Sequence, residues 1–533
     1  MNAVPADINE EMAAMLGEDI ADKIEATDGD GKPRKQADVL LEIGQCHELF
    51  HDDAGAAYAQ VRVNDHDEVH AVDSRDYREL LAASYLDVSG RGCNKNALAD
   101  AVTTLSSLAK FRGKRRDVYL RVASGNDRIY IDTGRSDWRV VEVDSRGHRI
   151  ARNPPRFRRA GAPLPLPEPA SPDFSRLWKY ANVCDEHKPL VAGFMLAALR
   201  SSGPYPQLHL SGEQGTGKST LARVIKSVID PSASPLRSPP KEVRDLLVGA
   251  LNGWCLAMDN LSFLTPQLSD ALCRLSTGGA ISERTLYSNT DETLVEVQRP
   301  VILNGIEDLA VRPDLAERGL HVELELIRAR RDEAGFWREF KADAPHIFGA
   351  LLAGLSLAIR DHRKTNVGRL PRMADFALWV AAGIPALGFS ADEFMQSYRE
   401  NIDEGMTAGI DSSPVGRLLV EFAHLKTNWV GTAAELIKEL TTLTDDAMTR
   451  SPAWPRSPRG MAGILRRLAP ALRSAGIEVE KDRTGHARRL RLCCGQKQPS
   501  QASSPSRVPP VSDGCDGHDG QNREQHIAQE GEL

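Results

Sequence analysis

Hydrophobic and polar positions alternate along the chain with periods that predict both helices and strands. Apolar residues at every third or fourth position predict a helix over 95–111. Three runs of period two then predict strands, at 118–123, 128–132 and 138–143, with turn residues between them. We therefore expect a small α+β module over 37–160.

The middle of the chain has a different pattern, because short apolar strands alternate with amphipathic helices, as in an α/β nucleotide-binding domain. The strand 208–210 leads into a glycine-rich segment, and a helix over 221–229 follows. Further apolar strands are predicted at 254–258, 299–303 and 320–324. The pattern predicts a multidomain α/β protein whose nucleotide-binding core spans 172–360.

Two helices and a β-hairpin are predicted towards the C-terminus, and together they resemble a winged helix. The first helix covers 431–440 with Thr432 as its N-cap, and the second covers 457–473 with Ile464 facing inward. The hairpin covers 477–492. Between this module and the core the chain is mainly helical.

Composition places these elements in a soluble globular protein. Hydrophobic residues make up 41% and charged residues 26% of the 533 residues, which are enough for several domains. The eight cysteines lack zinc spacing, no signal peptide is evident, and the most apolar run, 189–199, is too short to span a bilayer. We expect a cytoplasmic protein with no membrane partner.

Changes in composition divide the chain into seven segments. They are a flexible leader (1–36), the α+β module (37–160), a Pro-rich linker (161–171), the core (172–360), a helical segment (361–410), the winged-helix-like module (411–494) and a disordered tail (495–533).

The glycine-rich segment between the first core strand and its helix reads Gly-Glu-Gln-Gly-Thr-Gly-Lys-Ser. In this position backbone N–H groups and the helix dipole bind a polyphosphate. Lys218 is predicted to reach the β- and γ-phosphates, and Ser219 to ligate Mg²⁺. A fortuitous Gly-rich turn is the alternative. The predicted ATP-binding residues are Gly212, Glu213, Gln214, Gly215, Thr216, Gly217, Lys218, Ser219 and Thr220.

Polar side chains at the ends of the next two strands are expected to complete a catalytic site. Asp259 is predicted to hold Mg²⁺ through water, the alternative being an ordinary Asp that ends a buried strand. Asn260 stands where many such ATPases carry Glu, so it can orient water but cannot act as a base. Asn304 is predicted to lie between the γ-phosphate and the lytic water, and a turn-forming Asn-Gly is its alternative.

Arg318 precedes the last core strand and is predicted to act in trans as an arginine finger. Its alternative is a solvated arginine at a helix end.

The net charge of −7 means that any nucleic-acid surface must be local. Over 451–495 basic residues outnumber acidic ones by ten to three, which favours DNA binding over a solvated basic face or a protein-binding winged helix. The predicted DNA contacts there are Arg466, Arg467, Arg473, Arg483, Arg488 and Arg489. A second basic cluster, Arg112 to Arg116, is compatible with a nucleic-acid contact or a solvated loop.

The order of the phosphate loop, Asp259, the segment 277–287, Asn304 and Arg318 resembles the superfamily 3 helicase domain. The resemblance is closest to the poxvirus-type and satellite-phage primase–helicases of viruses, prophages and plasmids. Relatives carry Gly-Gly-(Asp)…Ala-Arg-x-Leu-Tyr in the middle segment.

In this chain Ala280 stands where Asp is usual, and Glu283 precedes Arg284. The resemblance implies an AAA+-like P-loop NTPase core with a helical lid over 361–410. It also implies a homo-oligomeric ring, expected to be a hexamer, with single-stranded DNA in its pore and duplex at the C-terminal module. Arg284 matches the family's Arg and would face the DNA or the neighbouring nucleotide.

The sequence therefore predicts an ATP- and Mg²⁺-dependent DNA helicase or translocase that serves replication of a mobile element. An ATP-switched initiator or helicase loader is one alternative, and a regulatory or defence ATPase without unwinding activity is another. No Asp-x-Asp pair on a strand and no zinc knuckle is present, so primase activity is not predicted, and a primase or polymerase is expected only as a partner.

Overall fold

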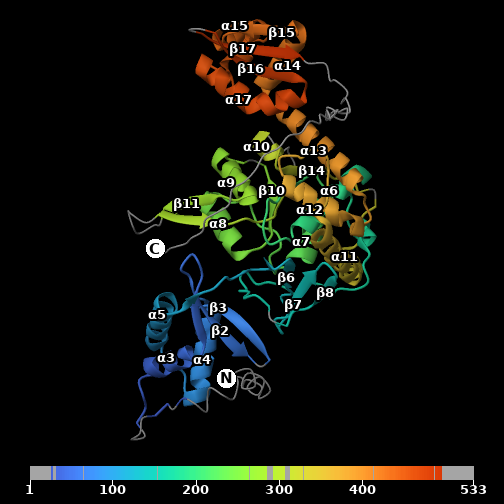
Figure 1. The fold of residues 1–533 in the computed structure, drawn as a ribbon. Helices are drawn as coiled ribbons and strands as arrows, with labels where there is room; N and C mark the ends of the chain where they lie inside the picture. Colours follow the sequence, from blue (N-terminus) through green and yellow to red (C-terminus); the bar gives the residue numbers. More distant parts are fainter. Residues whose placement is uncertain are drawn as a thin grey trace, which may run out of the picture. The chain divides into compact units, whose positions relative to one another are not determined.

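The computed structural model describes residues 24, 26–27 and 32–494, apart from 64, 153, 263, 285–291, 306–312, 328, 412 and 485–486. The predicted tail and most of the predicted leader lie outside the described residues. Four large hydrophobic clusters organise the rest, one in the N-terminal part, one in the C-terminal part and two in the centre, of which we call the larger the central cluster. Figure 1 labels the helices and strands that carry them.

The N-terminal cluster joins three helices to a four-stranded sheet of order β3-β2-β1-β4. The helices are α3 (Gln36–Gln45), α4 (Arg75–Ser89) and α5 (Lys95–Phe111), and the strands are β1 (Glu48–His51), β2 (Ala57–Val63), β3 (His66–Ala71) and β4 (Lys114–Arg115). Asn94 caps α5 by accepting a hydrogen bond from the Ala97 N–H, and Leu105 on the inner face is fully buried. The predicted helix over 95–111 is confirmed.

A second, antiparallel sheet follows in the order β5-β6-β7-β8. Its strands are β5 (Val122–Gly125), β6 (Arg128–Asp132), β7 (Val140–Asp144) and β8 (Gly147–Ile150). Ile131 and Val143 on its buried face belong to the central cluster, and the Ser356 hydroxyl donates to the Asp144 carbonyl oxygen at 2.7 Å. The segment predicted as one module over 37–160 thus contains two sheets that pack in different cores.

The central sheet is parallel throughout, in the order β10-β13-β9-β14. Its strands are β9 (Gln207–Ser211), β10 (Leu256–Leu261), β13 (Val301–Gly305) and β14 (Gly319–Glu323). Their apolar residues are buried because helices cover the sheet, as a parallel sheet requires. The connecting elements are α6 (Lys188–Ala197), α7 (Lys218–Ile229), α8 (Val243–Asn252), α9 (Pro266–Thr277), the hairpin β11 (Ala280–Arg284) and β12 (Glu292–Glu296), and α10 (Pro313–Ala316).

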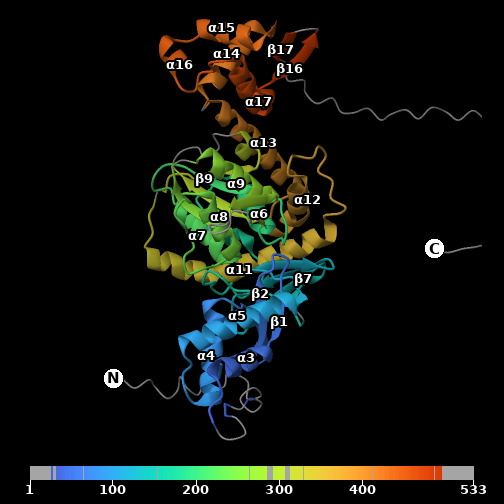
Figure 2. The ribbon, with the colours of Figure 1, turned by 90° about the vertical axis from the view of Figure 1, so that its left-hand side faces the viewer.

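A long helix, α11 (Glu333–Asp361), packs against β7 and β8 and also against α12 (Ala374–Gly383) and the short helix η1 (Phe174–Lys179). Figure 2 shows α11 as a long helix beside β7. Among the described residues it is the one helix long and apolar enough to cross a membrane, yet 67% of its apolar window is buried within the protein. It therefore has the character of a core helix. After α12, α13 (Ala391–Asp411) leads towards the C-terminal part.

The C-terminal cluster contains helices α14 (Pro414–Lys426), α15 (Ala433–Thr442), α16 (Asp446–Arg450) and α17 (Pro458–Ser474) and strands β15 (Asn428–Gly431), β16 (Ile477–Thr484) and β17 (Ala487–Cys494). Thr432 and Glu435 form a capping box at the start of α15, so the predicted N-cap is confirmed. On α17 the buried position is Leu465, whereas Ile464, predicted to face inward, is only half-buried. The buried face of α17 is therefore rotated by one residue, about 100°, from the predicted face at this position.

Candidate functional site

The loop 212–217 connects the carboxyl end of β9 to the first turn of α7. Gly212 has φ +131°, and a Cβ at this position would lie 2.8 Å from the Leu324 carbonyl oxygen. Gly217, with φ +90°, caps α7 in a left-handed conformation that side chains avoid. The Thr216 hydroxyl closes the loop by donating to the Glu213 carbonyl oxygen at 3.0 Å. The loop therefore forms a fixed cradle before a helix N-terminus, where anions bind.

Lys218 is buried at the first position of α7, and its ammonium group lies over the loop. It donates to the carbonyl oxygens of Gly212 at 2.7 Å and Glu213 at 2.8 Å. Burial lowers the pKa of Lys218 below its ordinary value, and the carboxylate of Asp259 partly offsets this effect. The loop thus has a positive charge at its centre.

Ser219, Asp259 and Asn304 meet beside this ammonium group from three different elements. The Ser219 hydroxyl of α7 donates to Asp259 Oδ1 at 2.8 Å. The Asn304 amide of β13 is almost completely buried and donates to the Ser219 hydroxyl at 3.0 Å and to Asp259 Oδ1. Asn304 therefore fixes the other two side chains, and it also lines the cavity beside the loop, so its predicted position between the γ-phosphate and water stays a prediction.

Asn260 lies in β10 next to Asp259 and is exposed. The strand runs on to Leu261, beyond the predicted end at residue 258, with a break in register between Met258 and Leu261. Asn260 has φ +59°, which asparagine tolerates better than most residues. An irregularity of this kind re-aims side chains, and here Asn260 lines the cavity.

The loop, Asp259, Asn260 and Asn304 share a cavity of about 1010 Å³. Trp178 from η1 and Phe336 and Trp337 from α11 form an aromatic side of this cavity. The cavity is large enough for a nucleoside triphosphate, and aromatic walls suit a planar base.

Three arginines line the same cavity, and one of them, Arg331, pairs with Glu339. The Arg223 guanidinium lies 4.7 Å from the centre of the Trp337 ring. Arg330 extends towards the loop, because its Nη2 would lie 3.6 Å from a Cβ on Gly215. The sequence did not point to Arg330, and its only signal is a basic run just before the N-cap of α11.

Arg318 is the predicted catalytic residue that the structure does not bring to this cavity. It precedes β14, whose first residue, Gly319, pairs with Gln207 at the amino end of β9. The phosphate loop follows the carboxyl end of the same strand. Arg318 therefore lies at the opposite edge of the sheet from the loop of its own chain.

The structure exposes most of the predicted DNA contacts in the C-terminal part. The side chains of Arg466, Arg467, Arg473 and Arg489 are exposed, whereas those of Arg284, Arg483 and Arg488 lie outside the described residues.

On α17, Arg459, Arg466 and Arg473 recur every seven residues and lie within about 40° of one another, opposite the buried face. We call these three residues the arginine stripe. Among the described residues, none of the three has an ion-pair partner.

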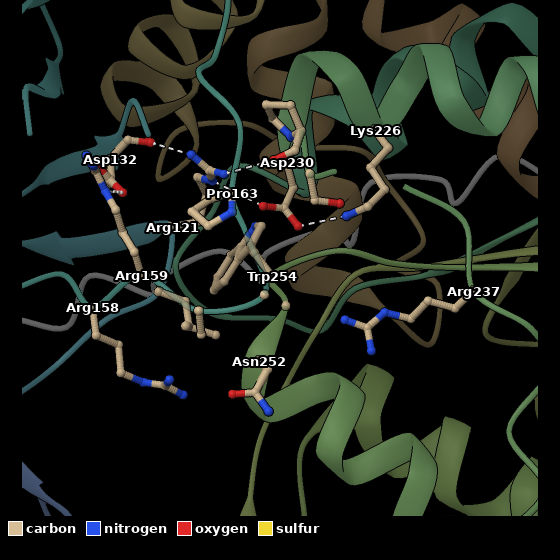
Figure 3. A pocket seen from close by; sticks show the side chains of 16 residues that line it. Arg121, Asp132, Arg158, Arg159, Pro163, Lys226, Asp230, Arg237, Asn252 and Trp254 are labelled. Carbon is tan, nitrogen blue, oxygen red and sulfur yellow. Dashed lines mark hydrogen bonds and ion pairs between the residues drawn. The ribbon is translucent and has the colours of Figure 1, made fainter. Parts of the chain in front are cut away.

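A second, smaller cavity of about 30 Å³ lies at the C-terminal end of α7 (Figure 3). Arg121 of the antiparallel-sheet segment donates to Asp230 at 3.1 Å, and Lys226 of α7 donates to the same carboxylate at 2.9 Å. Burial alone would raise the pKa of Asp230. The charges of Lys226 and Arg121 outweigh burial and hold this pKa below its ordinary value. The buried charges of Arg121, Lys226 and Asp230 neutralise one another here, so we interpret this place as an ion-pair junction.

Two family models match the chain. Residues 173–407 match the Actinomycete integrative conjugative element replication protein, and residues 415–505 match the AICE RepA C-terminal domain. Both models describe one kind of protein, and together they match more than half of the chain. The chain is thus a replication protein of a mobile genetic element. The particular family that it matches is that of the RepA replication proteins of actinomycete integrative conjugative elements.

Three solved structures of the C-terminal region of NrS-1 are also similar, at 10% identity and TM-scores of 0.34 to 0.36. Each match covers 86% of this chain and 98% of the solved chain. At so low a TM-score the likeness supports no conclusion about function. No curated protein matches the chain.

Proposed function

We propose that the chain is an ATP-dependent DNA helicase or translocase that acts in replication of its mobile element. The observation that carries this proposal is the 2.8 Å contact between the Ser219 hydroxyl and the Asp259 carboxylate, beside the buried ammonium group of Lys218. A hydroxyl, a carboxylate and a lysine around a glycine-rich loop are the groups that hold the phosphates and the metal ion in P-loop NTPases.

The residues fit Mg²⁺ and ATP. Mg²⁺ prefers oxygen ligands, and Ser219 and Asp259 would hold it as the pair that Asn304 already fixes. Lys218 and Arg330 would contact the phosphates, and their positive charges would stabilise the charge that develops during hydrolysis. Bound with Mg²⁺, ATP supplies the free energy for movement along DNA.

Asn260 would orient the attacking water by hydrogen bonding, as glutamine does in some GTPases. Because an amide cannot accept the proton as a carboxylate does, slow turnover is expected. The all-parallel sheet with its loop at the carboxyl edge supports an AAA+-like core, in which Arg318 would serve the neighbouring subunit of a ring.

The arginine stripe supports contact with duplex DNA. It spans about 21 Å along α17, which is enough to meet several phosphates of one groove. Arg284 on the hairpin β11–β12 would face the DNA or the neighbouring nucleotide, as the family resemblance implies.

Displacement of a labelled strand from forked DNA tests this function, with Mg²⁺ and ATP present and Lys218→Ala as the control. ATP-dependent displacement by the chain, absent in Lys218→Ala, is the expected result. ATPase activity that DNA stimulates without displacement would instead assign a loader. Turnover that DNA does not affect would assign a regulatory ATPase.

A further inference from the structure

Phe111, the last residue of α5, is 87% exposed. Large aromatic side chains are normally buried, because burial of their apolar surface stabilises the fold. The other large apolar side chains exposed in the described part of 37–160, Leu86 and Ile150, are 48% and 49% exposed. Phe111 therefore stands out as a ring that the fold leaves in solvent.

The backbone that carries this ring is anchored. The N–H groups of Arg112 and Gly113 donate to the Leu108 carbonyl oxygen at 2.9 and 3.0 Å. A Cβ on Gly113 would lie 2.8 Å from the Leu49 carbonyl oxygen, so the segment lies directly against β1. The next residues form β4, which pairs with β1. The exposure of Phe111 is thus a property of a fixed surface.

Three cations lie within three residues of Phe111 in the sequence, namely Lys110, Arg112 and Lys114. All three are exposed, and within the described part of the chain none of them has an ion-pair partner. The next two arginines differ, because Arg115 pairs with Asp53 and Arg116 lies 3.6 Å from Glu48. Lys110 and Arg112 also complement the dipole at the end of α5, but this effect does not explain an exposed aromatic ring.

We propose that this surface, Lys110 to Lys114, binds single-stranded nucleic acid. The Phe111 ring would stack on an unpaired base while the three cations contact the adjacent phosphates, the combination that proteins use for single strands. A duplex keeps its bases stacked inside and offers no free face to the ring. This surface is separate from the phosphate loop and from the arginine stripe, and its binding requires no ATP hydrolysis.

The test uses the full chain without nucleotide, with the arginine stripe changed to alanine so that the C-terminal part does not mask the effect. Fluorescence anisotropy measures binding of labelled oligo-dT, oligo-rU and a duplex of equal length. Phe111→Ala should bind the single strands about 5-fold to 150-fold more weakly, whereas Phe111→Tyr keeps the ring and should bind normally. Leu86→Ala, an exposed apolar residue of the same module, is the matched control and should change nothing.

A second set of variants tests the charges. Alanine at Lys110, Arg112 and Lys114 together should lower the log–log salt slope for single strands by about 2. Lys35, Arg91 and Lys95, three exposed cations of the N-terminal part, serve as the control triple.

The outcomes separate the alternatives. Equal losses with dT and rU assign single-stranded nucleic acid in general, and a loss with dT alone assigns single-stranded DNA. Unchanged binding by Phe111→Ala would overturn the proposal, even if the charge triple weakens binding. A photo-cross-link from iodouracil in the oligomer should map to Phe111, and cross-links confined to other parts of the chain would also overturn it.

Discussion

Arg318→Ala tests whether the catalytic site is shared between subunits. Gly319 is in register with Gln207, and the phosphate loop begins five residues further along β9 at Gly212. At roughly 3.3 Å per residue the separation is about 16 Å, which is too far for an arginine side chain to reach its own loop. If Arg318 acts in hydrolysis, it must act on the nucleotide of a neighbour.

Arg318→Ala should therefore bind ATP normally and hydrolyse it about 10³-fold to 10⁵-fold more slowly, as loss of an arginine finger does. A mixture of Arg318→Ala and Lys218→Ala subunits should recover part of the activity. Each mixed interface that joins an intact loop to an intact Arg318 forms one complete site. A coupled ATPase assay measures the recovery, after pull-down of differently tagged chains has shown that mixed assemblies form.

Arg330→Ala is the matched control for this experiment, because Arg330 lies at the loop of its own chain. Mixing Arg330→Ala with Lys218→Ala leaves every site incomplete, so no activity should return. Mixed assemblies of Arg318→Ala and Lys218→Ala that stay inactive would refute the shared site. Recovery in the Arg330 mixture would show that Arg330 does not act in cis.

Two further predictions concern other parts of the chain. Asp230→Asn leaves Arg121 and Lys226 buried without a counter-charge and should lower the free energy of unfolding by about 3–5 kcal/mol in urea titrations. Asp127→Asn, which breaks the exposed pair with Arg363, should cost at most about 1 kcal/mol. The pKa of Asp230 is lowered in the folded state, so the stabilisation of the fold by its carboxylate is present above the ordinary carboxyl pKa. This stabilisation is lost as the pH falls through the folded-state pKa. A destabilisation by Asp230→Asn that stays constant in acid would contradict this pH dependence. Alanine at all three positions of the arginine stripe should reduce the log–log salt slope of duplex binding by about 3, and an unchanged slope would make the stripe a solvated face.

The local parts of the site could be predicted from the sequence. The loop 212–217 lies between a strand and a helix that the apolar pattern marks, and Asp259 follows an apolar run in a neighbouring strand. These signals work because the phosphate site is built from strand ends, whose position depends on local periodicity.

The remaining features depend on contacts between residues far apart in the chain. Arg330 comes to the loop only because α11 begins beside the cavity, and no motif marks that approach. The inner face of the antiparallel sheet lies in the central core because α11 covers it, which periodicity alone does not reveal. Asn304 could be placed at a strand end, but its two hydrogen bonds depend on the order of the sheet.

ATP hydrolysis by the purified chain, compared with Lys218→Ala in the presence of Mg²⁺, tests whether the loop 212–217 is a catalytic phosphate site. Lys218 supplies the positive charge at the centre of the loop, so its loss should abolish measurable phosphate release. Lys438→Ala, which removes an exposed lysine on α15, is a control and should keep the activity of the unmodified chain. We expect turnover in the unmodified chain and none in Lys218→Ala, whereas equal turnover in both would show that the loop 212–217 is not the site of hydrolysis.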